Sequence, residues 1–229
     1  MPSTIAASYG SVSSPGSGLN VPPRASACVI WRTFIGCGVQ ARAQLSALRA
    51  VRPITRAFAV DSHRTAAEQF CEYALDEHGV DCRLPASLRE ATRDSQIIVT
   101  TTPSERAVLH RDDVAAGAFI AAVGADNEHK QEIDPHLLAA AAVIVDDLEQ
   151  CAHGGDLRHA LAALVMQLAD VRGSLDQVVG GIRDGRRSVD EIIVFDSTGV
   201  AIEDVAAAAL VFERASAGGI GIEMALAGR

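Results

Sequence analysis

Short apolar runs alternate with longer helical patterns along most of this chain, and this alternation constrains the fold more than any other feature. The runs that suit buried strands lie at 29–35, 54–60, 80–84, 96–100, 118–123 and 142–145. Between several of them, apolar residues recur at the three- and four-residue spacing of a helix. This order is typical of a parallel sheet wrapped by crossover helices. The sequence therefore predicts an α/β fold, a Rossmann-like, doubly wound, mostly parallel sheet of roughly five or six strands.

The two ends of the chain read differently. Residues 1–27 are rich in Ser, Gly and Pro and lack an amphipathic period, which predicts disorder. An acid-poor, Ser-rich start also fits a transit peptide, although early arginines are missing. Near the other end, residues 191–195 predict one more strand and residues 201–216 predict a long Ala-rich helix.

Charge and cysteine content exclude several classes of function. The 20 basic and 29 acidic residues give a net charge of −9, which argues against a nucleic-acid partner. No apolar stretch approaches the roughly 20 residues that a membrane span requires, so we expect a soluble, cytoplasmic protein. The five cysteines are odd in number and never spaced C-x-x-C, so neither a disulfide framework nor a metal site is expected.

The sharpest motif is a glycine turn, Gly36-x-Gly38-x-x-Ala41, between a predicted strand and a predicted helix. In dinucleotide-binding folds the first glycine makes the turn, the second admits a pyrophosphate, and the small third residue lets helix and strand pack closely. Asp61 closes the next strand, where a carboxylate would bind a ribose diol and repel a 2′-phosphate. This favours NAD over NADP, although Arg64 lies nearby. The alternative is a glycine turn that binds another ligand or none.

A second candidate site directly follows the predicted strand 118–123. Asp126 and Lys130 are four residues apart, and Lys130 is the only lysine among 20 basic residues. A carboxylate beside an ammonium can act as a base, an acid or a substrate clamp. The alternative is a solvated ion pair at helical spacing. A third candidate is the segment 196–199 before the last helix, which also fits a helix cap with a glycine turn.

Taken together, these segments resemble the ornithine cyclodeaminase/mu-crystallin family. The stretches that carry the likeness occur in order at 35–49, 95–105, 117–135, 142–151 and 191–209. The most specific motifs are G-x-G-x-Q-A, GAD-x-x-x-K and F-x-S-T-G-x-A-x-x-D. The resemblance implies an NAD-dependent enzyme, usually a homodimer, that acts on an amino acid or a cyclic imine. The expected reaction converts ornithine to proline by internal hydride transfer and loss of ammonia. The alternatives are an alanine dehydrogenase, a cyclic ketimine reductase or a non-catalytic dinucleotide-binding protein.

The resemblance also implies roles for individual residues. Asp126 is the expected acid/base near the substrate amine, and Lys130 is expected to orient it. The residues expected to bind the cofactor are Gly36, Gly38, Val39, Gln40 and Ala41 in the glycine turn, Asp61 at the ribose, Thr101 beside the dinucleotide, and Ser197 and Gly199 near the nicotinamide.

The chain departs from the family before the glycine turn, where members carry a much longer dimerisation and substrate domain. Only 35 residues precede Gly36 here, and 31–33 interrupt an apolar strand with polar side chains. We therefore expect a foreign start that ends near Phe34. We expect a Rossmann domain at 28–175, and at 176–229 a remnant of the second domain whose strand is left with an unpaired edge. Cofactor binding is expected to survive this loss and turnover to be impaired.

Overall fold

The computed structural model describes residues 31–222 and Met224. The contacts between residues divide the described part of the chain into two compact units. One unit ends at Thr198 and the other begins at Gly199, and each is described by itself. The predicted disordered segment 1–27 lies outside the described residues.

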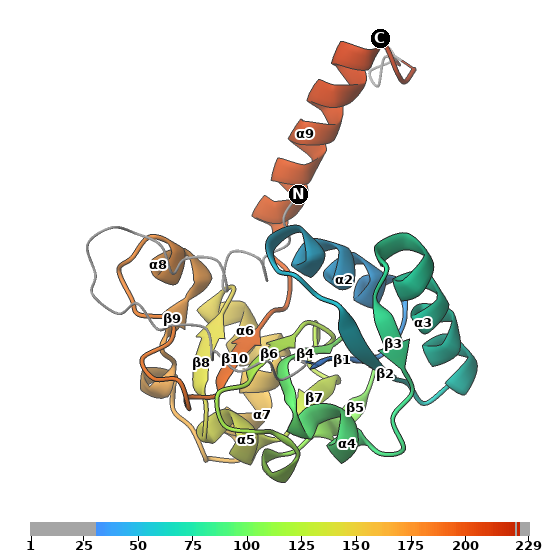
Figure 1. Ribbon diagram of the computed structural model, residues 1–229. Helices are drawn as coiled ribbons and strands as arrows, with labels where there is room; N and C mark the ends of the chain where they lie inside the picture. Colours follow the sequence, from blue (N-terminus) through green and yellow to red (C-terminus); the bar gives the residue numbers. More distant parts are fainter. Residues whose placement is uncertain (1–30, 223, 225–229) are drawn as a thin grey trace. The chain divides into compact units, whose positions relative to one another are not determined.

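An eight-stranded sheet forms the centre of the first unit (Figure 1), and its strand order is β3-β2-β1-β4-β6-β10-β8-β9. All of its strand pairs are parallel. The strands are β1 Trp31–Ile35, β2 Arg56–Val60, β3 Asp81–Arg83, β4 Ser95–Thr100, β6 Phe119–Ala122, β8 Ala142–Val145, β9 Gly173–Ser174 and β10 Ile193–Asp196. The α/β prediction is confirmed. The strand number is higher than predicted because β10 joins this sheet and because β9, with two residues, is too short to produce a pattern.

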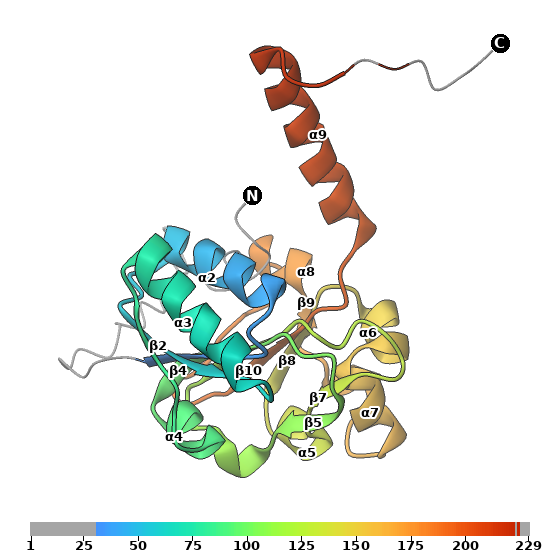
Figure 2. The same ribbon diagram turned by 90° about the vertical axis from the view of Figure 1, so that its right-hand side faces the viewer.

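Helices cover both faces of the sheet. They are α2 Val39–Val51, α3 Arg64–His78, α4 Leu88–Arg93, α5 Pro135–Ala139, α6 Leu148–Gly154, α7 Asp156–Ala162 and α8 Leu175–Val179, with short 3-10 turns η1 Arg111–Asp113 and η2 Leu168–Asp170. Figure 2 shows α2 and α3 on one side and α4, α5 and α7 on the other. Alternate strand residues feed two separate cores, because Phe34 packs in the cluster with α2 and α3, whereas Ile35 packs in the cluster with α5 and α7.

A second, two-stranded sheet was not predicted. It pairs β5 Glu105–Leu109 with β7 Gln131–Ile133 in parallel. Both strands are short and mix charged with apolar residues, so neither gives a clear period. Strand β7 ends the loop that carries Asp126 and Lys130, so this small sheet helps to position a candidate site.

Strand β1 contains the residues 31–33 that the sequence assigned to a foreign start. Trp31 stacks on Phe58 with ring centroids 4.1 Å apart, and Arg32 and Thr33 are buried. The Thr33 hydroxyl donates to the carbonyl of Ala91 at 2.6 Å, so this polar side chain is satisfied inside the core. The expected foreign start ending near Phe34 is therefore wrong, because the polar residues of 31–33 belong to a paired strand.

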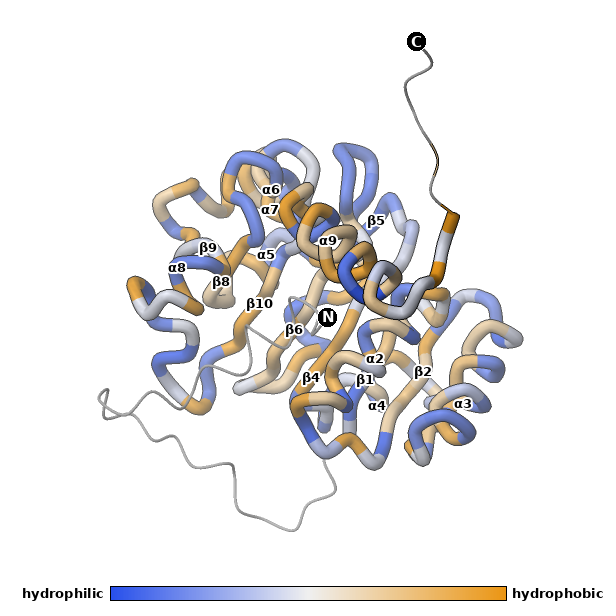
Figure 3. Tube along the Cα trace, turned by 90° about the horizontal axis from the view of Figure 1, so that it is seen from above, coloured by the Kyte–Doolittle hydropathy of each residue, from blue (hydrophilic) through white to orange (hydrophobic). Residues whose placement is uncertain are grey.

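The place of the last strand is also a correction. Strand β10 lies between β6 and β8 and pairs with both, so it is a central strand of the main sheet and has no free edge. Figure 3 shows hydrophobic residues along β10, as expected for a strand covered on both faces. The expected boundary at 175/176 therefore does not separate two domains. The division lies between Thr198 and Gly199.

The second unit contains helix α9, Ala201–Gly218, which confirms the long Ala-rich helix predicted there. No residue of α9 is buried, and its large apolar side chains Ile202, Val205, Val211 and Phe212 are exposed. None of the described helices is both long and apolar enough to cross a membrane.

The central position of β10 predicts how two phenylalanines differ in their effect on stability. Phe195→Ala should lower the free energy of unfolding by about 3–5 kcal/mol, because the Phe195 side chain is fully buried and its removal leaves a cavity in the core. Phe212→Ala is the matched control, since this side chain is 72% exposed, and it should change the value by less than about 0.5 kcal/mol. Urea unfolding measures both. Equal effects would contradict the placement of β10 inside the core.

Candidate functional site

The carboxyl ends of six neighbouring parallel strands form one row along the sheet. Backbone hydrogen bonds join each end to the next: Gly36 N–H to Val60 O at 2.8 Å, Thr101 N–H to Ile35 O at 2.9 Å, Val123 N–H to Thr100 O at 3.0 Å, Ser197 N–H to Ala122 O at 2.9 Å and Asp146 N–H to Asp196 O at 3.2 Å. The predicted site residues of the first unit therefore lie along the same edge, where open α/β sheets bind ligands.

The first glycine of the turn has no room for a side chain. Gly36 has a φ of +84°, and a Cβ on it would lie 2.7 Å from the carbonyl oxygen of Thr101. The Thr101 hydroxyl donates to the Gly36 carbonyl at 2.8 Å. Only glycine combines this backbone angle with this close approach. Thr101 therefore packs against the turn, next to the expected dinucleotide position.

Asp61 braces the same turn from the neighbouring strand. Its Oδ2 accepts the Cys37 N–H at 2.8 Å, and its Oδ1 accepts the His63 N–H at 2.8 Å. Sequence reasoning gave Asp61 a ribose-binding role only. The structure adds a local role. The carboxylate fixes the backbone of two neighbouring connections, at Cys37 between β1 and α2 and at His63 between β2 and α3.

The start of α2 is open, in contrast to Gly36. Gly38 is the N-cap and supplies no side chain to the helix, and a Cβ on it would meet nothing within 4 Å. Val39 and Gln40 are exposed, whereas Ala41 is fully buried against the sheet. The first amides of a helix have no partner within the helix and attract anions. This open helix start can therefore hold a phosphate group.

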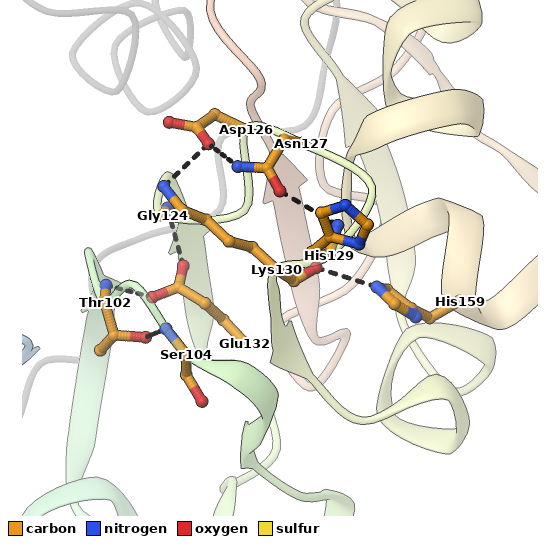
Figure 4. A network of polar contacts seen from close by, with 9 residues as sticks. All are labelled: Thr102, Ser104, Gly124, Asp126, Asn127, His129, Lys130, Glu132 and His159. Atoms are coloured by element: carbon orange, nitrogen blue, oxygen red, sulfur yellow. Dashed lines mark hydrogen bonds and ion pairs between the residues drawn. The ribbon is translucent and has the colours of Figure 1, made fainter.

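The loop after β6 brings the two predicted catalytic residues together (Figure 4). Lys130 Nζ lies 2.8 Å from Asp126 Oδ1, and the Asn127 amide donates to the same oxygen at 2.9 Å. The side chains of Asp126 and Lys130 are 52% and 26% exposed. The ring of His159 contacts the Lys130 carbonyl at 2.9 Å. The ion pair considered as the alternative does form, and it holds a solvent-accessible carboxylate at the sheet edge.

A buried carboxyl anchors this loop. Glu132 Oε2 accepts the Thr100 hydroxyl at 2.6 Å and the Gly124 N–H at 2.7 Å, and Oε1 accepts the Thr102 N–H at 2.5 Å. Figure 4 shows Glu132 between Thr102, which follows β4, and Gly124, which follows β6. Burial raises the pKa of Glu132, while these donors oppose the shift. Gly124 fits here because a Cβ would lie 2.5 Å from the Glu132 carboxyl carbon.

Two further buried carboxyls continue from Glu132 into the core. Asp156 Oδ1 accepts the backbone N–H groups of Glu132 at 2.8 Å and Ile133 at 2.9 Å. Asp196 in turn accepts the N–H groups of Asp156 at 3.2 Å and Leu157 at 2.8 Å. Burial raises the pKa of Asp196 to about 7, and burial together with the charge of Asp196 raises the pKa of Asp156. The three carboxyls link β7, α7 and β10.

The last predicted residues divide between the two units. Ser197 is buried, and its hydroxyl donates to Asp146 Oδ2 at 3.0 Å. The Thr198 hydroxyl donates to Asp146 Oδ1 at 3.3 Å. Gly199, with a φ of +82°, is the first residue of the second unit. Ser197 therefore lies at the sheet edge with the other candidates, held there by Asp146.

Sequence reasoning missed the roles of Glu132, Asp146, Asp156 and Asp196. Position gives a signal for two of them, since Asp146 directly follows β8 and Asp196 ends β10. Glu132 and Asp156 give none, because Glu132 accepts from Thr100, 32 residues away, and Asp156 accepts from Glu132 and Ile133, 24 and 23 residues away.

The raised pKa of Asp196 predicts a pH-dependent stability. The folded chain holds this proton more tightly than the unfolded chain, so the stabilisation is complete below about pH 4 and is lost as the pH rises through 7. In Asp196→Asn the decline between pH 4.5 and 7.5 should be smaller than in the wild type by roughly 2–4 kcal/mol. Urea unfolding at both pH values measures it. Parallel declines in the two proteins would mean that Asp196 ionises normally in the fold.

Comparison with solved structures finds the same fold with substantial sequence identity. Δ1-pyrroline-2-carboxylate reductase of Thermococcus litoralis, solved with NADH and L-proline, matches 86% of this chain and 61% of its own with a TM-score of 0.83 and 30% identity. A lysine cyclodeaminase, solved to explain recognition of L-lysine, L-ornithine and L-2,4-diaminobutyric acid, matches 86% of this chain and 56% of its own with a TM-score of 0.76 and 30% identity.

The sequence comparisons agree with the structural ones. Alanine dehydrogenase of Archaeoglobus fulgidus is 43% identical over 188 residues, which are 82% of this chain and 58% of that protein. The chain thus spans less than two thirds of the relatives that it matches. The model of the ornithine cyclodeaminase/mu-crystallin family matches residues 24–219, a match that begins ten residues before Phe34. With most of its length matched, the chain belongs to the ornithine cyclodeaminase/mu-crystallin family.

Proposed function

We propose that the first unit binds NAD(H), with the pyrophosphate against the backbone amides at the start of α2. The observation that carries the proposal is the contrast between the two glycines. The space beside Gly36 is filled by Thr101, whereas the space beside Gly38 is open. The first glycine thus forms the turn and the second leaves room for a ligand at a helix start. The NADH-bound reductase of the same family supports this assignment.

The proposed preference for NAD over NADP rests on Asp61. This carboxylate lies beside the glycine turn and its side chain is 15% exposed. A negative charge there favours a ribose diol and repels a 2′-phosphate. Because its two oxygens already accept the N–H groups of Cys37 and His63, the charge is fixed in position.

For the chemistry, we propose hydride transfer at a carbon next to nitrogen in an amino acid or a cyclic imine. The bound nicotinamide supplies or accepts the hydride. Asp126 takes a proton from the substrate amine or returns one, and Lys130 Nζ, 2.8 Å away, orients the carboxylate. Glu132 fixes the loop to the ends of β4 and β6, so these groups keep their place on the same edge as the glycine turn.

Two reactions fit this site. In the first, ornithine gives proline and ammonia, and the hydride that leaves the substrate returns to it. The resemblance of the motifs to ornithine cyclodeaminases favours this reaction, as does the likeness to a lysine cyclodeaminase. In the second, NAD(H) is consumed by an alanine dehydrogenase or ketimine reductase, which the 43% identity to an alanine dehydrogenase favours. A non-catalytic dinucleotide-binding protein is the remaining alternative.

The open space at Gly38 predicts a variant that folds but binds poorly. In Gly38→Ala the added methyl should weaken NADH binding about tenfold or more, because it occupies the pyrophosphate position, and should leave the unfolding temperature unchanged. Fluorescence titration with NADH measures binding. Ala43→Ser, at an exposed position further along α2, is the control and should bind like the wild type. Wild-type protein should bind NADH more tightly than NADPH. Unchanged binding in Gly38→Ala would refute the proposed position.

A substitution at Asp126 should separate binding from turnover. Asp126→Asn should lower the rate at least about 100-fold and leave the NADH dissociation constant within about twofold, because only proton transfer is lost. Glu128→Gln, an exposed change on the same loop, should keep the wild-type rate. Proline formed from ornithine without net NADH change indicates cyclodeamination. NADH oxidation with pyruvate and ammonium indicates an alanine dehydrogenase, and NADH oxidation with a cyclic ketimine indicates a ketimine reductase. Equal rates in wild type and Asp126→Asn would exclude Asp126 as the acid/base, and NADH binding without turnover of any of these substrates would favour the non-catalytic alternative.

A further inference from the structure

Two cysteine thiols lie in contact on the α3 side of the sheet. Cys71 is in α3 and Cys82 is in β3, and a hydrogen bond joins their Sγ atoms, which are 2.7 Å apart. Both are free thiols and both are partly exposed. They are 11 residues apart and do not form a C-x-x-C motif, so the spacing rule that excluded disulfides overlooked them.

The fold between the two cysteines is well defined. Helix α3 ends at Gly79, where the Gly79 N–H donates to the Leu75 carbonyl at 2.8 Å and the Val80 N–H donates to the Ala74 carbonyl at 2.9 Å. The chain then turns back into β3, which pairs with β2. The contact between the sulfurs is therefore set by the packing of α3 on the sheet edge. Closing a disulfide requires the sulfurs to approach by only about 0.7 Å more.

The two thiols also differ in acidity. The hydrogen bond with Cys82 lowers the pKa of Cys71, whereas the same hydrogen bond and burial raise the pKa of Cys82. Burial raises the pKa of Cys37 to about 12 and also raises the pKa of Cys151. Among the cysteines that the structure describes, Cys71 is thus the one favoured as a thiolate. The thiolate is the nucleophile in disulfide exchange.

We propose that Cys71 and Cys82 form a redox-active pair that a low-molecular-weight disulfide, such as oxidised glutathione, converts to an intramolecular disulfide. The Cys71 thiolate attacks one sulfur of the small disulfide, which forms a mixed disulfide and releases one small thiolate. Cys82 then loses its proton to solvent and attacks the Cys71 sulfur, which releases the second small thiolate. The two protein thiols are oxidised, and the small disulfide is reduced to two thiols.

The disulfide would tie the edge strand to its helix. Strand β3 has three residues and pairs only with β2 among the described strands. The covalent link closes the segment from Cys71 to Cys82, which restricts the unfolded chain more than the folded one. This modification site is independent of the proposed catalytic function, because it requires neither cofactor nor substrate.

The test counts thiols in the full chain after incubation in glutathione buffers of increasing reduction potential, which are increasingly oxidising. After alkylation and mass spectrometry, the oxidised protein should carry two fewer alkyl groups, and digestion should yield one peptide pair joined through Cys71 and Cys82. Its unfolding temperature should exceed that of the reduced protein by about 5 °C, because the closed segment is short. A joined pair that includes Cys37, or an unfolding temperature that does not rise, would overturn the proposal.

Three variants test the order of attack. Cys82→Ser should stop at a mixed disulfide with glutathione on Cys71, whereas Cys71→Ser should gain none at Cys82. Cys151→Ser is the control, because this buried thiol packs in the other core, and it should still form the Cys71–Cys82 pair. A mixed disulfide that persists on Cys71 in the wild type would refute the pair, since Cys82 would then be unable to attack.

Discussion

The structure depends on one buried carboxyl group. Glu132 receives donors from Thr100, Thr102 and Gly124, which are the ends of two neighbouring strands, and its own N–H donates to Asp156. A buried carboxyl is costly unless such partners satisfy it. Moving any one of these donors away would leave the buried carboxyl short of a hydrogen bond, so the free-energy cost of that loss holds the donors in place. This constraint fixes where the loop with Asp126 and Lys130 leaves the sheet, and it places that loop on the same edge as the glycine turn.

Three glycines in the glycine turn and the acidic loop serve different purposes. At Gly36 a backbone angle and the contact with Thr101 exclude a side chain, so the turn is tight. At Gly124 the Glu132 carboxyl fills the space that a Cβ would need. Gly38 alone of the three is left open. Glycine thus permits close packing of protein atoms at Gly36 and Gly124, whereas at Gly38 it leaves space for a ligand.

Local patterns predicted much of the fold and the place of most candidate site residues on it. The strand at 142–145, the helix now bounded as Arg64–His78 and the edge shared by Gly36, Thr101 and Asp126 followed from apolar period and motif order. Contacts between distant residues were not predictable. The polar residues of 31–33 indicated an interrupted strand, whereas in the structure the Thr33 hydroxyl is satisfied by the Ala91 carbonyl. The central place of β10 depends on partners 50 and more residues earlier, and the Cys71–Cys82 contact depends on how α3 packs against β3.

The central claim is that the open helix start at Gly38 and the carboxylate of Asp126 serve one bound dinucleotide. A crystal structure of the chain with NADH tests it most directly. The account predicts phosphate oxygens within hydrogen-bonding distance of the amides of Gly38, Val39 or Gln40, and a nicotinamide ring that extends past Thr101 toward Asp126. Phosphates bound elsewhere, or a ring directed away from Asp126, would contradict it.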